Sequence, residues 1–353
     1  MKTEPISYMR RALELAKKGL GTVAPNPMVG ALLIKNNNVI GEGYHKQKGG
    51  PHAEVAAIED AEKSGENIED SWLFCTLEPC CHLNKLTPPC TDLIINKKIS
   101  KVFVACLDPN PEVAGKGVQK LRDHGIEVEV GLLEKEACDL NKVFFKYIIH
   151  KKPYLHLKVA MTLDGKMFSQ TGSSKWITSE VARKEVHALR KHYDGIWVGM
   201  NTLLNDDPSL NTRDGEKVIK ENSKVIIGDI QKLRDSKLKV MNHKDKVYFL
   251  NTGFEERNDI NSYSFNNDFN EALDWLGANG ITSLLVEGGS KLISGLIEND
   301  IYDEISIYLA PKLIGNGSSL YESEINFDME RAKELKGAWR LLDSNEAVFE
   351  VKK

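Results

Sequence analysis

The first half of the chain alternates between helical and strand-like patterns of apolar residues. Apolar side chains recur at helical spacing near the start, at Met9, Leu13, Ala16 and Leu20, and predict an opening helix. Further helices are predicted at 52–63, 91–98, 117–124 and 141–152. Strands are predicted at 29–34, 39–40, 72–76, 101–106 and 127–130. Strands that alternate with helices indicate a layered α/β domain.

The second half repeats this alternation after a charged break, His150-Lys151-Lys152-Pro153. We place a domain boundary near this break and expect domains at 1–148 and 149–353. The strands predicted beyond it lie at 153–160, 195–199, 224–227, 246–250, 283–286 and 304–310. The stretch 214–270 is polar and weakly patterned, so its details are poorly determined by the sequence.

Composition and charge limit the class of protein. The 353 residues include 47 Lys and Arg against 51 Asp and Glu, a net charge of -4, so we expect no nucleic-acid partner. No apolar run approaches the roughly 20 residues that cross a bilayer, and the charged opening helix lacks the apolar core of a signal peptide. We therefore expect a cytoplasmic protein without a membrane partner. Its six cysteines then serve as metal ligands, nucleophiles or core residues.

Metal-binding side chains occur in three short segments of the first half. The segments are His52-Ala53-Glu54, Glu78-Pro79-Cys80 and Pro88-Pro89-Cys90. One imidazole and two thiolates leave an open position on zinc, where water becomes acidic near neutral pH. Because a proline precedes each candidate ligand, we expect His52, Cys80 and Cys90 at helix N-termini. His52 must lie at the extreme start of its helix if it is to converge with Glu54, which could shuttle protons.

Plainer interpretations of the cysteines stay open at this point. Cys80, Cys81 and Cys90 could be core residues or could form a structural zinc site, although such a site usually closes with four ligands. Cys81 could also replace Cys80, whose assignment rests on the proline before it. The other cysteines occur in apolar contexts and are expected in the core or to be incidental; they are Cys75, Cys106 and Cys138.

The order of these segments resembles the zinc-dependent nucleobase deaminases. A longer series of motifs is similar to the bacterial bifunctional deaminase–reductase family of riboflavin biosynthesis, and this resemblance covers nearly the whole chain. The motifs are Pro25-Asn26-Pro27-Met28-Val29-Gly30, Gly43-Tyr44-His45, Thr76-Leu77-Glu78-Pro79-Cys80, Thr87-Pro88-Pro89-Cys90, Asp108-Pro109-Asn110-Pro111 and Gly115-Lys116-Gly117.

The resemblance assigns roles in the first domain. It implies that zinc is held by His52, Cys80 and Cys90. It also implies that Glu54 is the general acid and base, and that the pyrimidine is contacted by Asn26 and His45. The chain departs from the family in one place, because nine residues separate Cys80 from Cys90 where the family usually has eight, including a glycine.

The second half lacks the G-x-G-x-x-G fingerprint of a dinucleotide-binding Rossmann domain. It carries instead Glu287-Gly288-Gly289-Ser290 between a predicted strand and a helix. Glycines at such a turn let a phosphate approach the backbone and the N–H groups of the following helix. Arg190 and Arg213 could clamp a phosphate or form surface salt bridges, and Trp176 could stack on a ligand or pack in the core.

This second set of motifs resembles the reductase half of the same family, whose fold is similar to dihydrofolate reductase. The resemblance implies NADPH as hydride donor. Residues that match its cofactor positions are Ala160, Trp176, Thr202, Asp206, Gly289, Ser290 and Gly295. Residues expected at the substrate are Lys158, Ser174, Arg190, Leu210, Arg213 and Glu287. The expected architecture is a three-layer, cytidine-deaminase-like zinc domain followed by a dihydrofolate-reductase-like α/β domain.

The predicted function is two consecutive steps of riboflavin synthesis on a small pyrimidine ribose phosphate. Zinc-dependent deamination of 2,5-diamino-6-(ribosylamino)pyrimidin-4-one 5′-phosphate precedes NADPH-dependent reduction of the ribosyl group to a ribityl chain. Two rival classes are a tRNA or nucleoside deaminase, which would not need the second domain, and a non-catalytic binding module with structural zinc. Because enzymes of this size are often homo-oligomers, we expect a homodimer or homotetramer.

Overall fold

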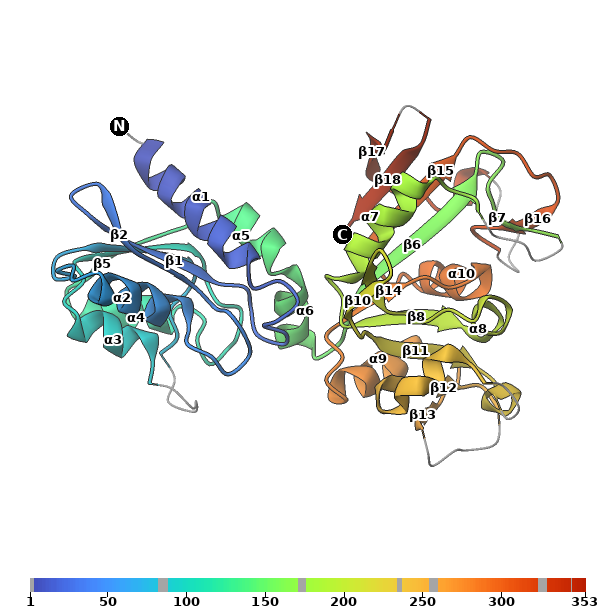
Figure 1. Ribbon diagram of the computed structural model, residues 1–353, viewed down its shortest axis with the longest axis horizontal. Coiled ribbons are helices and arrows are strands. Elements are labelled where there is room, and N and C mark those ends of the chain that lie inside the picture. The colour runs from blue at the N-terminus through green and yellow to red at the C-terminus, as the bar shows by residue number, and fades with distance from the viewer. Residues whose placement is uncertain are drawn as a thin grey trace. The chain divides into compact units, whose positions relative to one another are not determined.

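The computed structural model describes residues 3–81, 88–170, 176–233, 237–253, 260–322, 329–343 and 345–353. They form two compact units, 1–150 and 151–353 (Figure 1). The units divide at the end of helix α6 (Lys142–His150), close to the charged break in the sequence. None of the described helices combines the length and the apolar character needed to cross a membrane.

The first unit is built on a five-stranded sheet with the order β2-β1-β3-β4-β5. Its strands are β1 (Gly30–Lys35), β2 (Asn38–Tyr44), β3 (Trp72–Leu77), β4 (Lys101–Cys106) and β5 (Glu127–Val130). Its other helices are α1 (Thr3–Lys17), α2 (Ala53–Lys63), α3 (Cys90–Asn96), α4 (Lys116–Asp123) and α5 (Glu134–Leu140). Strand β1 runs antiparallel to β2 and β3, whereas β3, β4 and β5 are parallel.

Helices cover both faces of this sheet, as strand β1 illustrates. Ala31 and Leu33 pack into a core shared with α2, α3 and α4. Leu32 and Ile34 point to the opposite face and pack with α1 and α5. A strand buried on both faces appears in the sequence as a continuous apolar run. The expected three-layer arrangement of the first unit is confirmed.

The second unit is built on a nine-stranded sheet with the order β13-β12-β11-β8-β14-β6-β15-β18-β17. Neighbouring strands are parallel from β13 to β15, and β18 and β17 add antiparallel pairs at one edge. The strands are β6 (Tyr154–Thr162), β8 (Gly195–Gly199), β11 (Ser223–Gly228), β12 (Val247–Asn251), β13 (Asn261–Ser264), β14 (Ser283–Val286), β15 (Glu304–Ala310), β17 (Gly337–Leu341) and β18 (Ala347–Lys352).

Two small ribbons and several helices complete the second unit. The ribbons pair β7 (Lys166–Ser169) with β16 (Gly317–Ser319) and β9 (Thr212–Asp214) with β10 (Lys217–Lys220). The helices are α7 (Glu180–Arg190), α8 (Met200–Asp206), α9 (Phe269–Ala278) and α10 (Ser290–Glu298), with 3-10 turns η1 (Ile230–Leu233), η2 (Lys239–Lys246) and η3 (Met329–Arg331).

Helices lie on both faces of the larger sheet too. Trp197 of β8 belongs to the core formed with α9 and α10. Ile196 and Val198 belong to the core on the other face, formed with α8, η1 and η2. Helix α7 packs through Ala182 and Val186 on β15 and β18. The expected α/β class is confirmed for this half of the chain as well.

Candidate active sites

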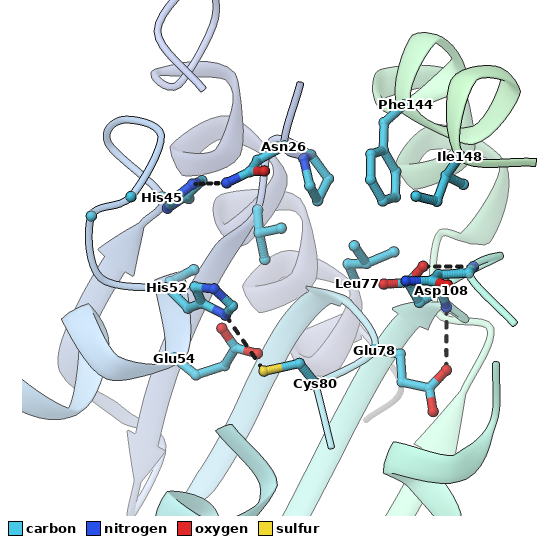
Figure 2. Close-up of a pocket in the computed structure, with 16 residues that line it drawn as sticks. Asn26, His45, His52, Glu54, Leu77, Glu78, Cys80, Asp108, Phe144 and Ile148 are labelled. Carbon is cyan, nitrogen blue, oxygen red and sulfur yellow. Dashed lines mark hydrogen bonds between the residues drawn. The ribbon is translucent and has the colours of Figure 1, made fainter. Parts of the chain in front are cut away.

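His52 stands immediately before helix α2, where its backbone is extended, with φ -69° and ψ 162°. This confirms the expectation that His52 precedes the first helical turn. Side chains two residues apart on a regular helix diverge, but the extended backbone at His52 turns its ring towards the Glu54 carboxyl group. Figure 2 shows both side chains facing the same space as Cys80.

The two cysteines reach this space from different kinds of segment. Cys90 is the first residue of α3, as expected. Cys80 lies in an irregular segment after β3, so the expectation that Cys80 starts a helix is wrong. The Glu78 N–H still donates to the Cys106 carbonyl at 3.0 Å, which prolongs the β3–β4 pairing beyond the strand. Cys80 nevertheless meets a helix N-terminus, because the Cys90 N–H donates to its sulfur at 3.3 Å.

The donor atoms of His52, Cys80 and Cys90 all lie within 4.8 Å of one another. The Nδ1 atom of His52 is 3.6 Å from the Cys80 sulfur and 3.3 Å from the Cys90 sulfur. A tetrahedral zinc ion, with bonds of about 2.0 Å to nitrogen and about 2.3 Å to sulfur, sets these atoms roughly 3.6 Å apart. The three residues therefore fit zinc. Cys81 is not in the potential metal-binding group found among the described residues.

Glu54 lies next to these ligands and is 3% exposed. Burial raises the pKa of Glu54 above its usual value, and the nearby His52 acts in the opposite direction. The sulfurs of Cys80 and Cys90 are close enough to affect the same carboxyl group. A carboxyl group beside a zinc site but outside its ligand set can accept and return protons.

A cavity of about 320 Å³ includes His52, Glu54 and Cys80 in its lining (Figure 2). Asn26 and His45 lie on its wall. The Pro51 carbonyl is 3.0 Å from His45 Nδ1 and must accept from it, so His45 Nε2 accepts from the Asn26 amide at 3.2 Å. These bonds fix the two residues that the family resemblance implies as contacts of the pyrimidine.

The lining of this cavity also includes residues that were not assigned a role from the sequence. Asp108 and Asn110 come from the loop after β4, and Phe144 and Ile148 come from α6. The position of the Asp108-Pro109-Asn110-Pro111 motif in the sequence could have placed it at this site. It follows a strand parallel to β3, and the carboxyl ends of parallel strands meet at one edge of a sheet.

The second unit has a larger cavity, of about 1380 Å³, at the carboxyl ends of β8, β11 and β14. The expected cofactor residues in its lining are Ala160, Trp176, Thr202, Asp206, Gly289 and Ser290. The expected substrate residues in its lining are Lys158, Arg190, Leu210, Arg213 and Glu287. Gly295 is not among the described residues that line the cavity. It packs instead against the Phe269 ring, which would lie 3.2 Å from a Cβ at this position. Ser174 lies outside the described residues.

The glycine turn of this cavity leads from β14 into α10, as expected. Gly288 packs on the helix that follows, since a Cβ there would lie 2.6 Å from the Leu292 side chain. Gly289 is the N-cap of α10, and the nearest atom to a Cβ there is the Thr202 hydroxyl, at 3.6 Å. Gly289 therefore leaves room at the start of a helix, where N–H groups can bind a phosphate. This turn fits a phosphate-bearing cofactor such as NADPH.

Arg190 is engaged by a carboxylate within the cavity. It donates from Nε and Nη2 to Glu287 at 2.7 and 2.9 Å, and from Nη1 to the Asn211 carbonyl at 3.0 Å. Burial acts to raise the pKa of Glu287, but Arg190 outweighs it and the pKa falls to about 2. Arg213 bonds to the side chains of Asn211 and Ser209. Arg190 is thus in a largely buried ion pair, not a surface salt bridge.

Two other basic groups lie near this pair. Burial lowers the pKa of Lys158, while Glu287 acts to raise it. Burial and then Arg190 lower the pKa of His187, which also lines the cavity. His187 was not among the residues expected at this site, although Arg183, His187 and Arg190 are spaced as neighbours on one face of α7.

Comparisons with known proteins agree with these two sites. The family of cytidine and deoxycytidylate deaminase zinc-binding regions matches residues 2–106, and the RibD C-terminal domain family matches residues 153–341. The riboflavin biosynthesis protein RibD of Aquifex aeolicus is 39% identical, over 97% of each chain. That of Escherichia coli is 35% identical, over 88% of each chain.

Solved structures extend the agreement to the whole fold. The deaminase/reductase of Thermotoga maritima superimposes with a TM-score of 0.90 at 37% identity, and RibD of Acinetobacter baumannii with 0.86 at 32% identity. Each comparison covers 99% of both chains. The chain therefore belongs to the RibD family, which joins a zinc-dependent deaminase and an NADPH-dependent reductase of riboflavin biosynthesis in one polypeptide.

Proposed function

We propose that this chain catalyses two consecutive steps of riboflavin synthesis. The first unit deaminates 2,5-diamino-6-(ribosylamino)pyrimidin-4-one 5′-phosphate, and the second reduces the ribosyl group of the product to a ribityl chain. The observation that carries the proposal is the convergence of His52, Cys80 and Cys90 beside a buried Glu54. The Thermotoga maritima relative, named a diaminohydroxyphosphoribosylaminopyrimidine deaminase and 5-amino-6-(5-phosphoribosylamino)uracil reductase, supports the choice of substrate.

In the first step, His52, Cys80 and Cys90 would hold zinc, which would supply a water acidic enough to lose a proton near neutral pH. Glu54 takes this proton and delivers it to a ring nitrogen as the water oxygen bonds to the ring carbon. Glu54 then carries the remaining hydroxyl proton to the departing amine. Its position suits the task, because the buried carboxyl group faces the same space as His52 and Cys80, and a general acid and base must lie within reach of the proton that it moves. Ammonia leaves and a carbonyl group replaces the amine.

Asn26 and His45 orient the pyrimidine in this step. Their mutual hydrogen bond and the bond from His45 to Pro51 hold both side chains in place before the substrate arrives. Fixed polar groups on a cavity wall select one orientation of a ring at a small cost in entropy. We assign ring recognition to this pair.

In the second step, NADPH bound in the larger cavity would supply the hydride for reduction of the opened sugar. The cavity of about 1380 Å³ exceeds the roughly 300–1,000 Å³ of a typical small-ligand site, as binding of a cofactor and a substrate together requires. We assign the cofactor to Ala160, Trp176, Thr202, Asp206, Gly289 and Ser290. We assign the sugar phosphate to the basic side of the cavity, which is formed by Lys158, Arg190 and Arg213 together with Leu210 and Glu287.

The chain is further proposed to act in the cytoplasm as a homodimer or homotetramer. No disulfide joins the six cysteines, all of which lie in the described part of the chain, and reducing conditions keep the two candidate thiolate ligands available to zinc. Light scattering coupled to size-exclusion chromatography of the full chain measures the oligomeric state directly.

Incubation of the zinc-loaded chain with the diaminopyrimidine phosphate tests the proposed function. Without NADPH, we expect ammonia and the deaminated ribosylamino product; with NADPH, we expect the ribityl product and one NADPH oxidised for each molecule formed. Cytidine and adenosine-containing tRNA should release no ammonia. Ammonia release from tRNA but not from the pyrimidine phosphate would overturn the proposed substrate.

A further inference from the structure

The carboxyl group of Glu78 is buried between two parts of the first unit. Glu78 follows strand β3, two residues before Cys80, and is 3% exposed. Its Oε2 atom accepts from the N–H groups of Asp108, at 3.2 Å, and Gly115, at 2.9 Å. Its Oε1 atom accepts from the Val118 N–H at 3.0 Å. Three backbone donors compensate the burial of one carboxylate.

These donors belong to the loop 107–115 and to the start of α4. Within the loop, the Asp108 side chain accepts from the Asn110 N–H at 2.9 Å, and the Asn110 side chain accepts from the Glu112 N–H at 3.1 Å. The Glu78 carboxylate is thus the first member of a chain of bonds that fixes the loop. This loop places Asp108 and Asn110 on the wall of the deaminase cavity, and Figure 2 shows the bond between Asp108 and Glu78.

Helix α4 approaches the same segment closely. A Cβ on Gly117 would lie 2.2 Å from the Pro79 carbonyl oxygen and 3.1 Å from Oε1 of Glu78. A backbone oxygen at that distance leaves no room for a side chain, so glycine is required for the contact. The start of α4 is therefore pressed against the segment that leads into Cys80.

We propose that Glu78 is a positioning residue of the deaminase site. Its carboxylate holds the loop 107–115 at a fixed distance from Cys80 and so sets the shape of the pyrimidine cavity. The proposed metal ligand Cys80 follows β3, and the loop that forms the opposite wall of the cavity follows β4. The backbone hydrogen bond from the Glu78 N–H to the Cys106 carbonyl lies near the end of the pairing between β3 and β4. Beyond that bond, the Glu78 side chain connects the two segments. The inference rests on the assignment of this cavity as the deaminase site.

Glu78→Gln in the full chain tests the inference. The glutamine NH2 group cannot accept from backbone N–H donors, so at least one of the three bonds is lost. We expect the KM for the diaminopyrimidine phosphate to rise at least tenfold, with zinc content unchanged. Reduction of the deaminated product by NADPH, in the same chain, should keep its wild-type rate. Hydrogen exchange at the amides of Asp108, Gly115 and Val118 should accelerate, while exchange in α2 stays constant.

Glu69→Gln is the matched control, because Glu69 belongs to the same unit and forms an exposed ion pair with Lys98. It should leave KM unchanged. Glu78→Asp keeps both acceptor atoms on a shorter side chain, so we expect a KM between those of the wild type and Glu78→Gln. If Glu78→Gln does not fold, Glu78→Asp is the variant that tests the inference. A wild-type KM in the Glu78 variants overturns the inference, and so does a loss of activity that merely follows a loss of zinc.

The two proposals fail in different ways. If the wild-type chain releases no ammonia from the pyrimidine phosphate, the proposed function is wrong. The exchange measurement then still decides whether Glu78 holds the loop, because it needs no substrate. Unchanged exchange in Glu78→Gln would show that the loop does not depend on this carboxylate and would overturn the positioning role.

Discussion

Arg190 and Glu287 form a bidentate ion pair in the wall of the reductase cavity, with 14% and 13% of their side chains exposed. The two residues come from distant parts of the chain, at the end of α7 and directly after β14. Removing one partner of such a buried pair leaves an uncompensated charge. This lowers the stability of the fold far more than replacing both partners by apolar residues of similar size. The pair therefore holds this part of the cavity together as well as setting its charge.

The stability conferred by this pair should depend on pH. Burial alone would raise the pKa of Glu287, but Arg190 lowers it from a usual value of 4.5 to about 2. A lowered carboxyl pKa stabilises the fold above the unfolded value and loses this effect as the pH falls from about 4.5 to about 2. The shift corresponds to about 3 kcal/mol at neutral pH.

Glu287→Gln should accordingly lower the free energy of unfolding by a few kcal/mol at pH 7, and by much less at pH 3. Urea titrations of both proteins at pH 3, 5 and 7, followed by tryptophan fluorescence, measure the difference. A difference that is equal at all three values would show that the carboxylate charge does not stabilise the fold.

Separate serine substitutions of Cys80 and Cys81 decide which of the two cysteines is the zinc ligand. Cys80→Ser should lose zinc and deaminase activity, because the Cys80 sulfur lies 3.6 Å from Nδ1 of His52. Cys81→Ser should retain one zinc per chain, because Cys81 lies outside the group that could hold a metal. Metal analysis after dialysis gives the answer, and NADPH-dependent reduction serves as a control for folding. If Cys81→Ser loses zinc and Cys80→Ser retains it, the metal ligand is Cys81 and not Cys80.

A separate variant distinguishes the proton carrier from the metal ligands. Glu54→Gln should retain zinc and the reductase reaction while the kcat of deamination falls about 10²–10⁴-fold, the usual contribution of a positioned acid and base. Glu59→Gln on the same helix is the matched control, since Glu59 forms a surface pair with Lys63. Full deaminase activity in Glu54→Gln would remove this residue from the mechanism.

Elements with a clear apolar pattern could be predicted from the sequence, and those without one could not. Strands β4, β5, β8, β14 and β15 have the predicted bounds. Strand β17 is exposed at all five positions and shows no alternation, and β9 and β16 have three residues each. Such strands form because neighbouring strands supply their hydrogen-bond partners. The residues of the short strand itself do not indicate this pairing.

The candidate sites show the same division. Metal-binding residue types in short segments point to His52, Cys80 and Cys90 from the sequence alone, and the structure brings their donor atoms within 4.8 Å of one another. The sequence did not show that Cys80 would follow a strand without starting a helix, because the extended β3–β4 pairing determines its backbone. Phe144 lines the deaminase cavity from α6, a position that its own neighbours do not indicate.

The glycine turn before α10 allows the cofactor site to be tested without disturbing the fold. Gly289 has φ -73° and ψ 173°, which alanine adopts without strain, and a Cβ there would meet the Thr202 hydroxyl at an ordinary 3.6 Å. Gly289→Ala should therefore fold normally. Because the added methyl group occupies space beside the N–H groups at the start of α10, we expect the KM for NADPH to rise at least tenfold.

Gly288→Ala provides the comparison, because its Cβ would lie 2.6 Å from the Leu292 side chain, which must then move. That variant should lose about 1 kcal/mol or more of stability through overpacking. Deamination should be unaffected in Gly289→Ala, so ammonia release from the same preparation reports on folding of the first unit. A wild-type KM for NADPH in Gly289→Ala would place the cofactor phosphates elsewhere in the cavity, away from the N-terminus of α10.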